Sequence, residues 1–228
     1  MREKLFSIVQ NRKIPVEKRM FCVLRTAKNL QDALDEGELF ERDFISDMEL
    51  YLQEEIKEFS GGFYETVQVL RKDLLRLEVL REEWKANLKA TENLFQKGEI
   101  WYMDKRERYK AEIKNTIGQE QWDIYKEQLL MFFLYTYFCG AVYDDMIYSK
   151  GVLSVISVFW IEEITFWNWA KDERIIEEKN ILETAYRYAR EIEHSDENLN
   201  LLEEIFDSDK WYEPETLKSI LVSERKTV

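Results

Sequence analysis

Histidine, proline, cysteine and glycine are all scarce in this sequence of 228 residues. With two prolines and seven glycines, residues that end helices are rare, so long helices are expected. The two cysteines, Cys22 and Cys139, lie in apolar segments, which indicates buried thiols rather than a disulfide framework. His194 is the single histidine. It argues against a di-iron centre, which needs two Glu-x-x-His motifs, and against a zinc site.

The sequence also lacks long apolar segments. The two most apolar ones, Leu129–Tyr143 and Val152–Ile161, are shorter than the roughly 20 residues that a membrane span needs. The N-terminus has no apolar stretch long enough for a secretory signal peptide. We therefore expect a cytoplasmic protein with no membrane span. Glycine-rich phosphate-binding motifs are missing as well, so a Rossmann-type pocket has no support in the sequence.

Acidic residues are abundant, and the net charge is −13. The first 28 residues are an exception, because eight basic side chains there face two acidic ones, so the remaining residues carry a net charge of −19. Such an acidic surface repels the phosphate backbone, and nucleic acid is not expected as a partner. The favoured interpretation of this charge is a solvated surface, and the alternative is that it attracts a lysine-bearing protein.

Apolar residues recur every three or four positions along most of the chain, which is the period of a helix, and no long alternation predicts a strand. The sequence therefore predicts an all-α fold, a multi-helix bundle of roughly nine helices with no sheet. Residues 1–228 are expected to form a single helical domain, and a soft boundary near residue 98 is the alternative. Phe63–Phe95 is expected to be either one long helix or broken pieces. The segment Glu120–Tyr143 starts charged and becomes almost wholly apolar, so its end is expected in the centre of the domain.

Polar residues interrupt the most apolar helix, Val152–Ala170, at Glu162, Glu163 and Asn168. A carboxylate inside such a helix must be paired, exposed or shifted in pKa. We expect at least one of the two glutamates to meet Arg187 or Arg190. The aromatic residues of this helix predict core packing rather than a cation–π cage for lysine: Trp160, Phe166, Trp167 and Trp169.

The segment "REIEHSDENL", Arg190–Leu199, surrounds the histidine with polar residues. If the helix continues through it, one polar face is formed by Arg187, Arg190, Glu191, His194 and Asn198. The opposite, apolar face would then be formed by Leu182, Ala185, Ala189 and Ile192. If Ser195 instead caps a new helix, His194 lies at a corner. On spacing alone, a structural polar network is favoured over a catalytic cluster.

A second polar group, Asp144 and Asp145, follows the apolar segment in "AVYDD". These aspartates are predicted to cap the next turn. The alternative is a polar pocket at the helix end that they share with Tyr143.

Two of these segments together resemble a known family. "AVYDDMIYSKGVLSVIS", followed by "YRYAREIEHSDENLNLLEEIF", resembles the C-terminal part of the flagellin lysine N-methylases, which has a similar Arg-Glu-x-Glu-His-Ser-x-x-Asn run and an upstream Tyr-Asp turn. "LFSIVQNRKIPVEKRMFCVLRTAKNLQ" looks like an arginine-bearing helix of the same family. The resemblance covers most of the chain, and the run around His194 is its most specific part.

The resemblance implies a bacterial enzyme that transfers a methyl group from S-adenosylmethionine to lysine side chains of flagellin or another lysine-bearing protein. Members of the family typically begin with a cysteine-rich segment that suggests a metal or iron–sulfur cluster. Two cysteines cannot supply the roughly four thiolates of a cluster, so no metal is expected here. The chain is thus expected to be the helical portion of such a protein, without the cysteine-rich segment.

The resemblance also implies site residues, because a lysine methyltransferase must present a neutral amine, and a nearby base can take or hold the proton. The expected catalytic residues are His194, Glu191, Tyr143 and Asp144. The expected substrate-binding residues are Arg190, Asn198 and Glu162. A non-catalytic helical module that binds a basic or filament-type protein is the alternative function.

Overall fold

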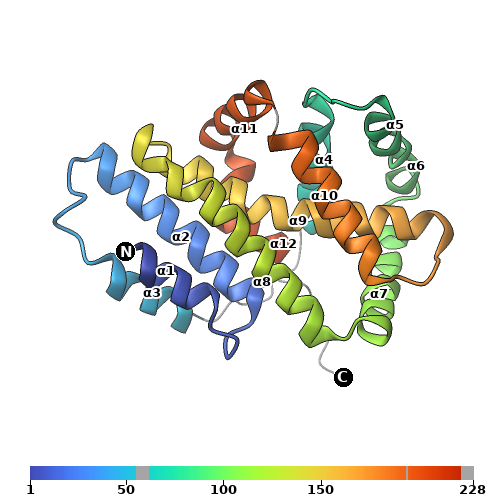
Figure 1. The fold of residues 1–228 in the computed structure, drawn as a ribbon, viewed down its shortest axis with the longest axis horizontal. Helices are drawn as coiled ribbons and strands as arrows, with labels where there is room; N and C mark the ends of the chain where they lie inside the picture. The colour runs from blue at the N-terminus through green and yellow to red at the C-terminus, as the bar shows by residue number, and fades with distance from the viewer. Residues whose placement is uncertain (55–61, 194, 222–228) are drawn as a thin grey trace. The chain divides into compact units, whose positions relative to one another are not determined.

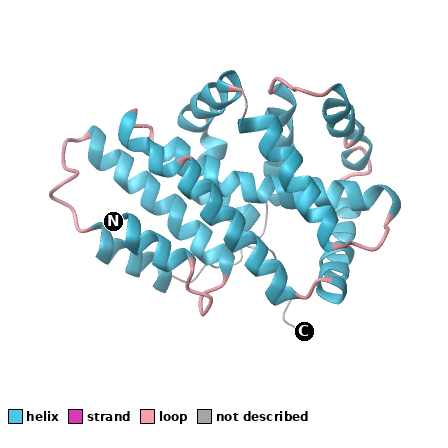
Figure 2. Cartoon of the chain, viewed as in Figure 1, coloured by secondary structure: helices cyan, strands magenta, loops and turns pink. Residues whose placement is uncertain are grey.

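The computed structural model describes residues 1–54, 62–193 and 195–221. Within these ranges the chain forms α-helices, α1 to α12, two short 3-10 helices, η1 and η2, and no β-strand (Figure 2). The predicted all-α fold is therefore confirmed, with more helices than the roughly nine expected.

The helices, which Figure 1 colours by their position in the sequence, belong to two compact units, each built from separate stretches of the chain. The first unit comprises Met1–Gly62, Tyr125–Val158 and Leu202–Val228, and the second comprises Phe63–Ile124 and Phe159–Leu201. Three helices are divided between the units: α8 (Gln119–Thr136), α9 (Ile147–Asp172) and α11 (Asp196–Ser208). Residue 98 lies inside the second unit, and the single domain stays a prediction.

The first unit is built around α2 (Val16–Asp35). This helix packs against α1 (Arg2–Val9), α3 (Phe44–Gln53) and α12 (Pro214–Leu221). Its regularly spaced apolar side chains, among them Val23, are buried. At one such position Gly151 of α9 lies so close to α2 that a Cβ atom built on it would be 2.4 Å from the Cβ of Ala27.

Polar side chains hold neighbouring segments of the first unit together. The Gln31 side chain of α2 accepts hydrogen bonds from the backbone N–H groups of Ile147 and Tyr148, at 2.8 and 3.1 Å, and thereby caps the start of α9. Glu127 of α8 is buried and pairs with Arg12 at 2.9 Å and with Arg19 at 2.6 Å. These contacts join distant stretches of the sequence.

The end of the apolar segment Leu129–Tyr143 is not in the centre of its unit, so that expectation is wrong. The segment forms the end of α8 and then η1 (Phe138–Tyr143). Phe132, Tyr135 and Tyr143 are 49%, 72% and 90% exposed. A helix that is apolar on all sides can still bury only one face, and here that face is formed by Leu130, Phe133, Leu134 and Tyr137.

The second unit contains α4 (Phe63–Arg76), α5 (Glu82–Ala90), α6 (Glu92–Phe95), α7 (Glu99–Thr116) and α10 (Glu178–Glu193). Phe63–Phe95 is therefore broken, with a loop at residues 77–81 and a second break at Thr91. Arg71 of α4 stabilises that second break by donating to Thr91 Oγ1 at 2.5 Å and by pairing with Glu92 at 2.7 Å. Gly98, with a positive φ of 85°, separates α6 from α7.

The core of the second unit is aromatic. Tyr102, Phe166 and Trp167 are buried, and the ring of Tyr102 packs edge-to-face on Phe166 with centroids 5.2 Å apart. The aromatic residues of α9 thus lie in the core, as the sequence predicted.

Candidate functional site

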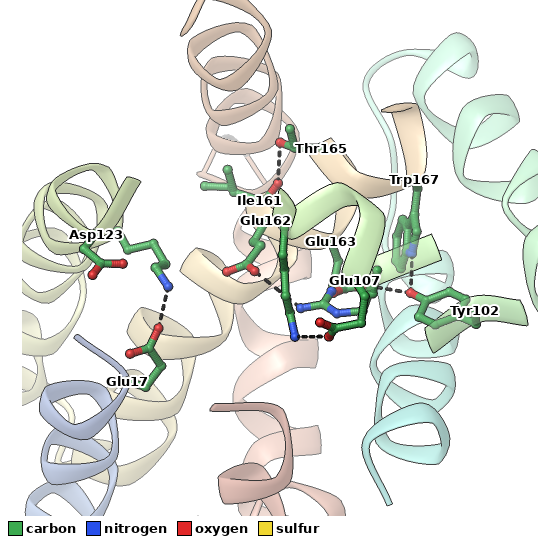
Figure 3. A network of polar contacts seen from close by, with 12 residues as sticks. Glu17, Tyr102, Glu107, Asp123, Ile161, Glu162, Glu163, Thr165 and Trp167 are labelled. Atoms are coloured by element: carbon green, nitrogen blue, oxygen red, sulfur yellow. Dashed lines mark hydrogen bonds and ion pairs between the residues drawn. The ribbon is translucent and has the colours of Figure 1, made fainter. Parts of the chain in front are cut away.

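The two glutamates of α9 lie in an ion cluster with α7 (Figure 3). Glu163 is fully buried and pairs with Arg106, and it accepts a hydrogen bond from the Tyr102 hydroxyl at 2.6 Å. Glu162 lies 3.4 Å from the same guanidinium group. The expected pairing with Arg187 or Arg190 is wrong, because α7, rather than α10, supplies the arginine that faces these glutamates.

The side chains of this ion cluster form hydrogen bonds and ion pairs mainly with one another. Trp167 Nε1 donates to the Tyr102 hydroxyl at 2.7 Å, which in turn donates to Glu163 (Figure 3). Burial raises the pKa of Tyr102 far above its usual value, so the phenol stays a donor. A buried charge that is paired with an opposite charge in the core is typical of a structural role. The substrate-binding role of Glu162 stays a prediction.

The "REIEHSDEN" segment contacts the loop that joins α4 to α5. Asn198 is 1% exposed, and its carboxamide accepts from the Glu78 backbone N–H at 2.7 Å and donates to the Glu78 carbonyl at 2.8 Å. The same amide nitrogen donates to the Glu191 carbonyl at 3.1 Å. The Glu191 carboxylate accepts from the Leu80 N–H at 2.8 Å. Glu191 and Asn198 are thus brought together, and both hold this loop.

α10 and α11 are separate helices, as predicted by the alternative in which Ser195 caps a new helix. Ser195 Oγ accepts from the Asn198 N–H at 3.2 Å, so Ser195 caps α11. His194 lies outside the described residues. Arg190 is exposed and donates to the Tyr186 hydroxyl at 2.9 Å.

The apolar face of α10 differs in part from the one expected, because Ile192 is buried whereas Ala185 and Ala189 are only partly buried. Leu182 is 57% exposed, whereas Ile181, Thr184 and Tyr188 are buried. The buried stripe therefore continues into Glu191, which is 4% exposed, and leaves Arg187 and Arg190 on the outside. The spacing alone assigned part of the buried face wrongly, because both faces of α10 carry apolar residues.

A groove runs along α5, α9 and α10 of the second unit. Three adjoining hollows share side chains that line it, and Arg187 lines all three. Trp84 and Asn87 come from α5, Asn168 from α9 and Thr184 from α10. The sequence did not predict this groove, and the one available signal was Asn168, a polar residue in an apolar helix.

The groove ends beside the start of the "REIEHSDEN" segment, Arg190–Asn198, which is called the motif below. Arg190 and Glu191 line its last hollow together with Trp84. Glu191 and Asn198 bind the loop at residues 77–81, which leads into α5. The motif therefore positions α5, which forms one side of the groove. Arg71 holds the other end of α5 through Thr91 and the Leu88 carbonyl.

The other predicted catalytic residues, Tyr143 and Asp144, belong to the first unit. Asp144 accepts from the Met146 N–H at 3.2 Å and pairs with Lys150, so it caps the turn as predicted. Partial burial alone would raise the pKa of Asp144, but the hydrogen bond from Lys150 lowers it overall. A lowered pKa makes this carboxylate a weaker proton acceptor. The catalytic roles stay predictions.

Metal ligands are sparse in the chain that the structure describes. No group of three or more His, Cys, Asp or Glu side chains there could hold a metal ion. Cys22 is buried, and burial raises the pKa of its thiol to about 11, which disfavours the thiolate that a cluster needs. The two thiols of this chain do not fit an iron–sulfur cluster. Separately, none of the described helices is long and apolar enough to cross a membrane.

The chain matches a known protein family. The family model described as "FliB lysine N-methylase C-terminal domain" matches residues 2–220. No curated protein and no solved structure matches the chain significantly.

Proposed function

Because the chain belongs to the FliB lysine N-methylase C-terminal domain family, we propose that it serves methyl transfer from S-adenosylmethionine to lysine side chains of a protein. The protein substrate is flagellin or another lysine-bearing protein. One observation carries this proposal: the motif on which the family resemblance rests builds a wall of the groove in the second unit. The whole chain is then the helical part that holds cofactor and substrate.

The groove has side chains that fit S-adenosylmethionine. This cofactor carries no phosphate, so the missing glycine-rich motifs are not an obstacle, and its sulfonium supplies an electrophilic methyl group. Carboxamides, hydroxyls and indole rings line the groove, as in Asn87, Thr184 and Trp84. Such a set of an aromatic surface and a few polar groups is typical of small-molecule sites.

The amine of the substrate lysine must lose its proton before it can accept a methyl group. We propose His194 as the group that takes or holds this proton, because an imidazole titrates near neutral pH. Glu191 is already bonded to Leu80 N, and Asn198 uses its carboxamide on the same loop. We therefore propose that these two position the groove, and that Arg190 at its rim contacts the protein substrate.

The proposed activity is tested by incubating the chain with methyl-labelled S-adenosylmethionine and flagellin and locating the label by mass spectrometry. We expect label on lysine. His194→Ala should lower the rate by about 100-fold or more, the range for loss of a general base. Asn200→Ala, at an exposed position of α11, is the control and should leave the rate unchanged.

The results separate two explanations of inactivity. Binding of the cofactor by calorimetry without methyl transfer would show that another part of the enzyme is needed for chemistry. Absence of both binding and transfer, in a folded sample, would contradict the proposal.

A second candidate function, a non-catalytic module that binds a basic or filament-type protein, is favoured by the exposed apolar side chains of the first unit. Phe132, Tyr135 and Tyr143 offer an apolar contact surface on α8 and η1. This function predicts that flagellin binds without the cofactor and that Tyr135→Glu abolishes binding. Tyr186→Glu, at an exposed position of α10, is the matched control.

A further inference from the structure

The widest part of the groove is a pocket of about 320 Å³ between the end of α9 and the start of α10. Its lining includes Asn87, Asn168, Trp169 and Ile176. This volume lies within the range of small-molecule pockets and exceeds what a few water molecules need. The chemistry of the lining therefore decides which molecule the pocket takes.

Two of the carboxamides that line the pocket, those of Asn87 and Asn168, are available to a ligand, whereas the Asn180 oxygen accepts from the Glu177 N–H at 2.8 Å. Within the described residues Asn87 makes no hydrogen bond, and the amide nitrogen of Asn168 has no partner. The Asn168 oxygen only meets Lys171 Nζ at 3.4 Å. A carboxamide offers a donor and an acceptor side by side, and this pair matches the edge of adenine. These two side chains, from α5 and α9, suit a nucleobase.

Trp169 contributes an apolar surface to the pocket. This residue is 8% exposed, and its indole nitrogen is fully buried, so the ring rather than the N–H group is what a ligand would contact. Ile176, 4% exposed, adds an aliphatic wall. A flat heterocycle suits a pocket with these two apolar side chains.

Charge in the pocket is balanced. Asp172 pairs with Arg174 at 2.9 Å, and Glu183 pairs with Arg187 at 2.6 Å. A lysine ammonium or a phosphate would therefore meet one like charge for each opposite charge. A neutral molecule with hydroxyl groups meets no such conflict, because a paired carboxylate retains free lone pairs that can accept from ribose hydroxyls.

We propose that this pocket binds an adenosine-type nucleoside, and that it holds the nucleoside end of S-adenosylmethionine. Naming the cofactor rests on the proposed function, whereas the nucleoside chemistry rests on the pocket alone. Asn87 and Asn168 bind the base, Trp169 and Ile176 cover it, and Asp172 and Glu183 accept from the ribose.

The test is calorimetric titration of the whole chain with adenosine, S-adenosylhomocysteine, methionine and ATP. Adenosine and S-adenosylhomocysteine should bind, methionine alone should not, and ATP should bind no more tightly than adenosine. Asn87→Ala and Asn168→Ala should each weaken adenosine binding by about threefold to tenfold, the loss expected for one hydrogen bond. Asn115→Ala, at an exposed position of α7, is the matched control and should bind normally.

Several results would overturn the site. They are no adenosine binding by the wild type, unchanged binding in both asparagine variants, and equal weakening in Asn115→Ala. Displacement of adenosine by a lysine amide would also overturn it, because the pocket would then take the substrate side chain. Since Asn87 and Asn168 are exposed, their variants should fold normally, and circular dichroism checks this.

Failure of this site and failure of the proposed function give different results. A chain that methylates flagellin but binds adenosine independently of Asn87 and Asn168 has the function without this site. A chain that binds adenosine through both side chains but transfers no methyl group to any lysine has the site without the function.

Discussion

Asn198 links three backbone positions through one side chain, the N–H and the carbonyl of Glu78 and the carbonyl of Glu191. At 1% exposure, water cannot replace these bonds. Asn198→Ala should therefore lower the free energy of unfolding by about 3 kcal/mol, because buried polar groups lose their partners. Urea denaturation measures the change. Asn200→Ala is the control, and an equal loss there would contradict the assignment.

Glu127 makes stability depend on pH. Burial alone would raise the pKa of this carboxyl, but hydrogen bonds from Arg12 and Arg19 lower it overall. The folded pKa then lies below the unfolded value of roughly 4.3, so the stabilisation is complete above that pH and is lost as the pH falls through the folded pKa.

The variant Glu127→Gln tests this pH dependence of stability. It should be less stable than the wild type at pH 7, and the gap should shrink as the pH falls below about 4. Urea denaturation at a series of pH values measures this gap. Glu120→Gln, at an exposed position of the same helix, should follow the wild type at every pH. A gap that stays constant down to acidic pH would show that charge is not what Glu127 contributes.

At the scale of elements, two helices approach closely where Gly151 of α9 faces Ala27 of α2. Gly151→Ala should lower the free energy of unfolding by about 1–2 kcal/mol, because overpacking outweighs the gain in helix propensity. Thermal unfolding measures it. Gly140→Ala is the control, since its Cβ would have only Lys150 Nζ nearby, at 3.9 Å. Restoration by adding Ala27→Gly would confirm the contact, and no rescue would contradict it.

Helices were predictable from the sequence where local signals mark them. Ser195 caps α11, which was one of the two alternatives that the sequence left open, because a serine cap acts within one turn. Partners across helices were not predictable. Glu163 pairs with Arg106, 57 positions away in the sequence, rather than with an arginine of α10, and periodicity carries no information on which helix faces which.

The candidate site was predictable only in part for the same reason. The motif was visible as a cluster of polar residues, and two of its members do act together, on a loop that no periodicity indicated. The groove needs α5, α9 and α10 side by side, which is a tertiary arrangement. Because both faces of α10 are partly apolar, the sequence also did not indicate which face is buried.

At the scale of the whole molecule, the net charge of −13 affects how fast a partner arrives. If the partner presents lysines, the association rate constant should fall steeply as salt rises from about 0.01 M to 1 M, because screening shortens the range of attraction. Surface plasmon resonance with immobilised flagellin measures this. A rate constant that is independent of salt would show that association is not steered by charge.

The packing of α2 against α12 has a consequence during synthesis. Residues 16–35 leave the ribosome long before α12 at residues 214–221 does. Until α12 is made, one apolar face of α2 has no cover, so the nascent chain exposes an apolar surface while the residues between the two helices are synthesised. Ribosome-bound intermediates that end before residue 214 should therefore recruit chaperones such as holdases, and release from them should coincide with the arrival of α12.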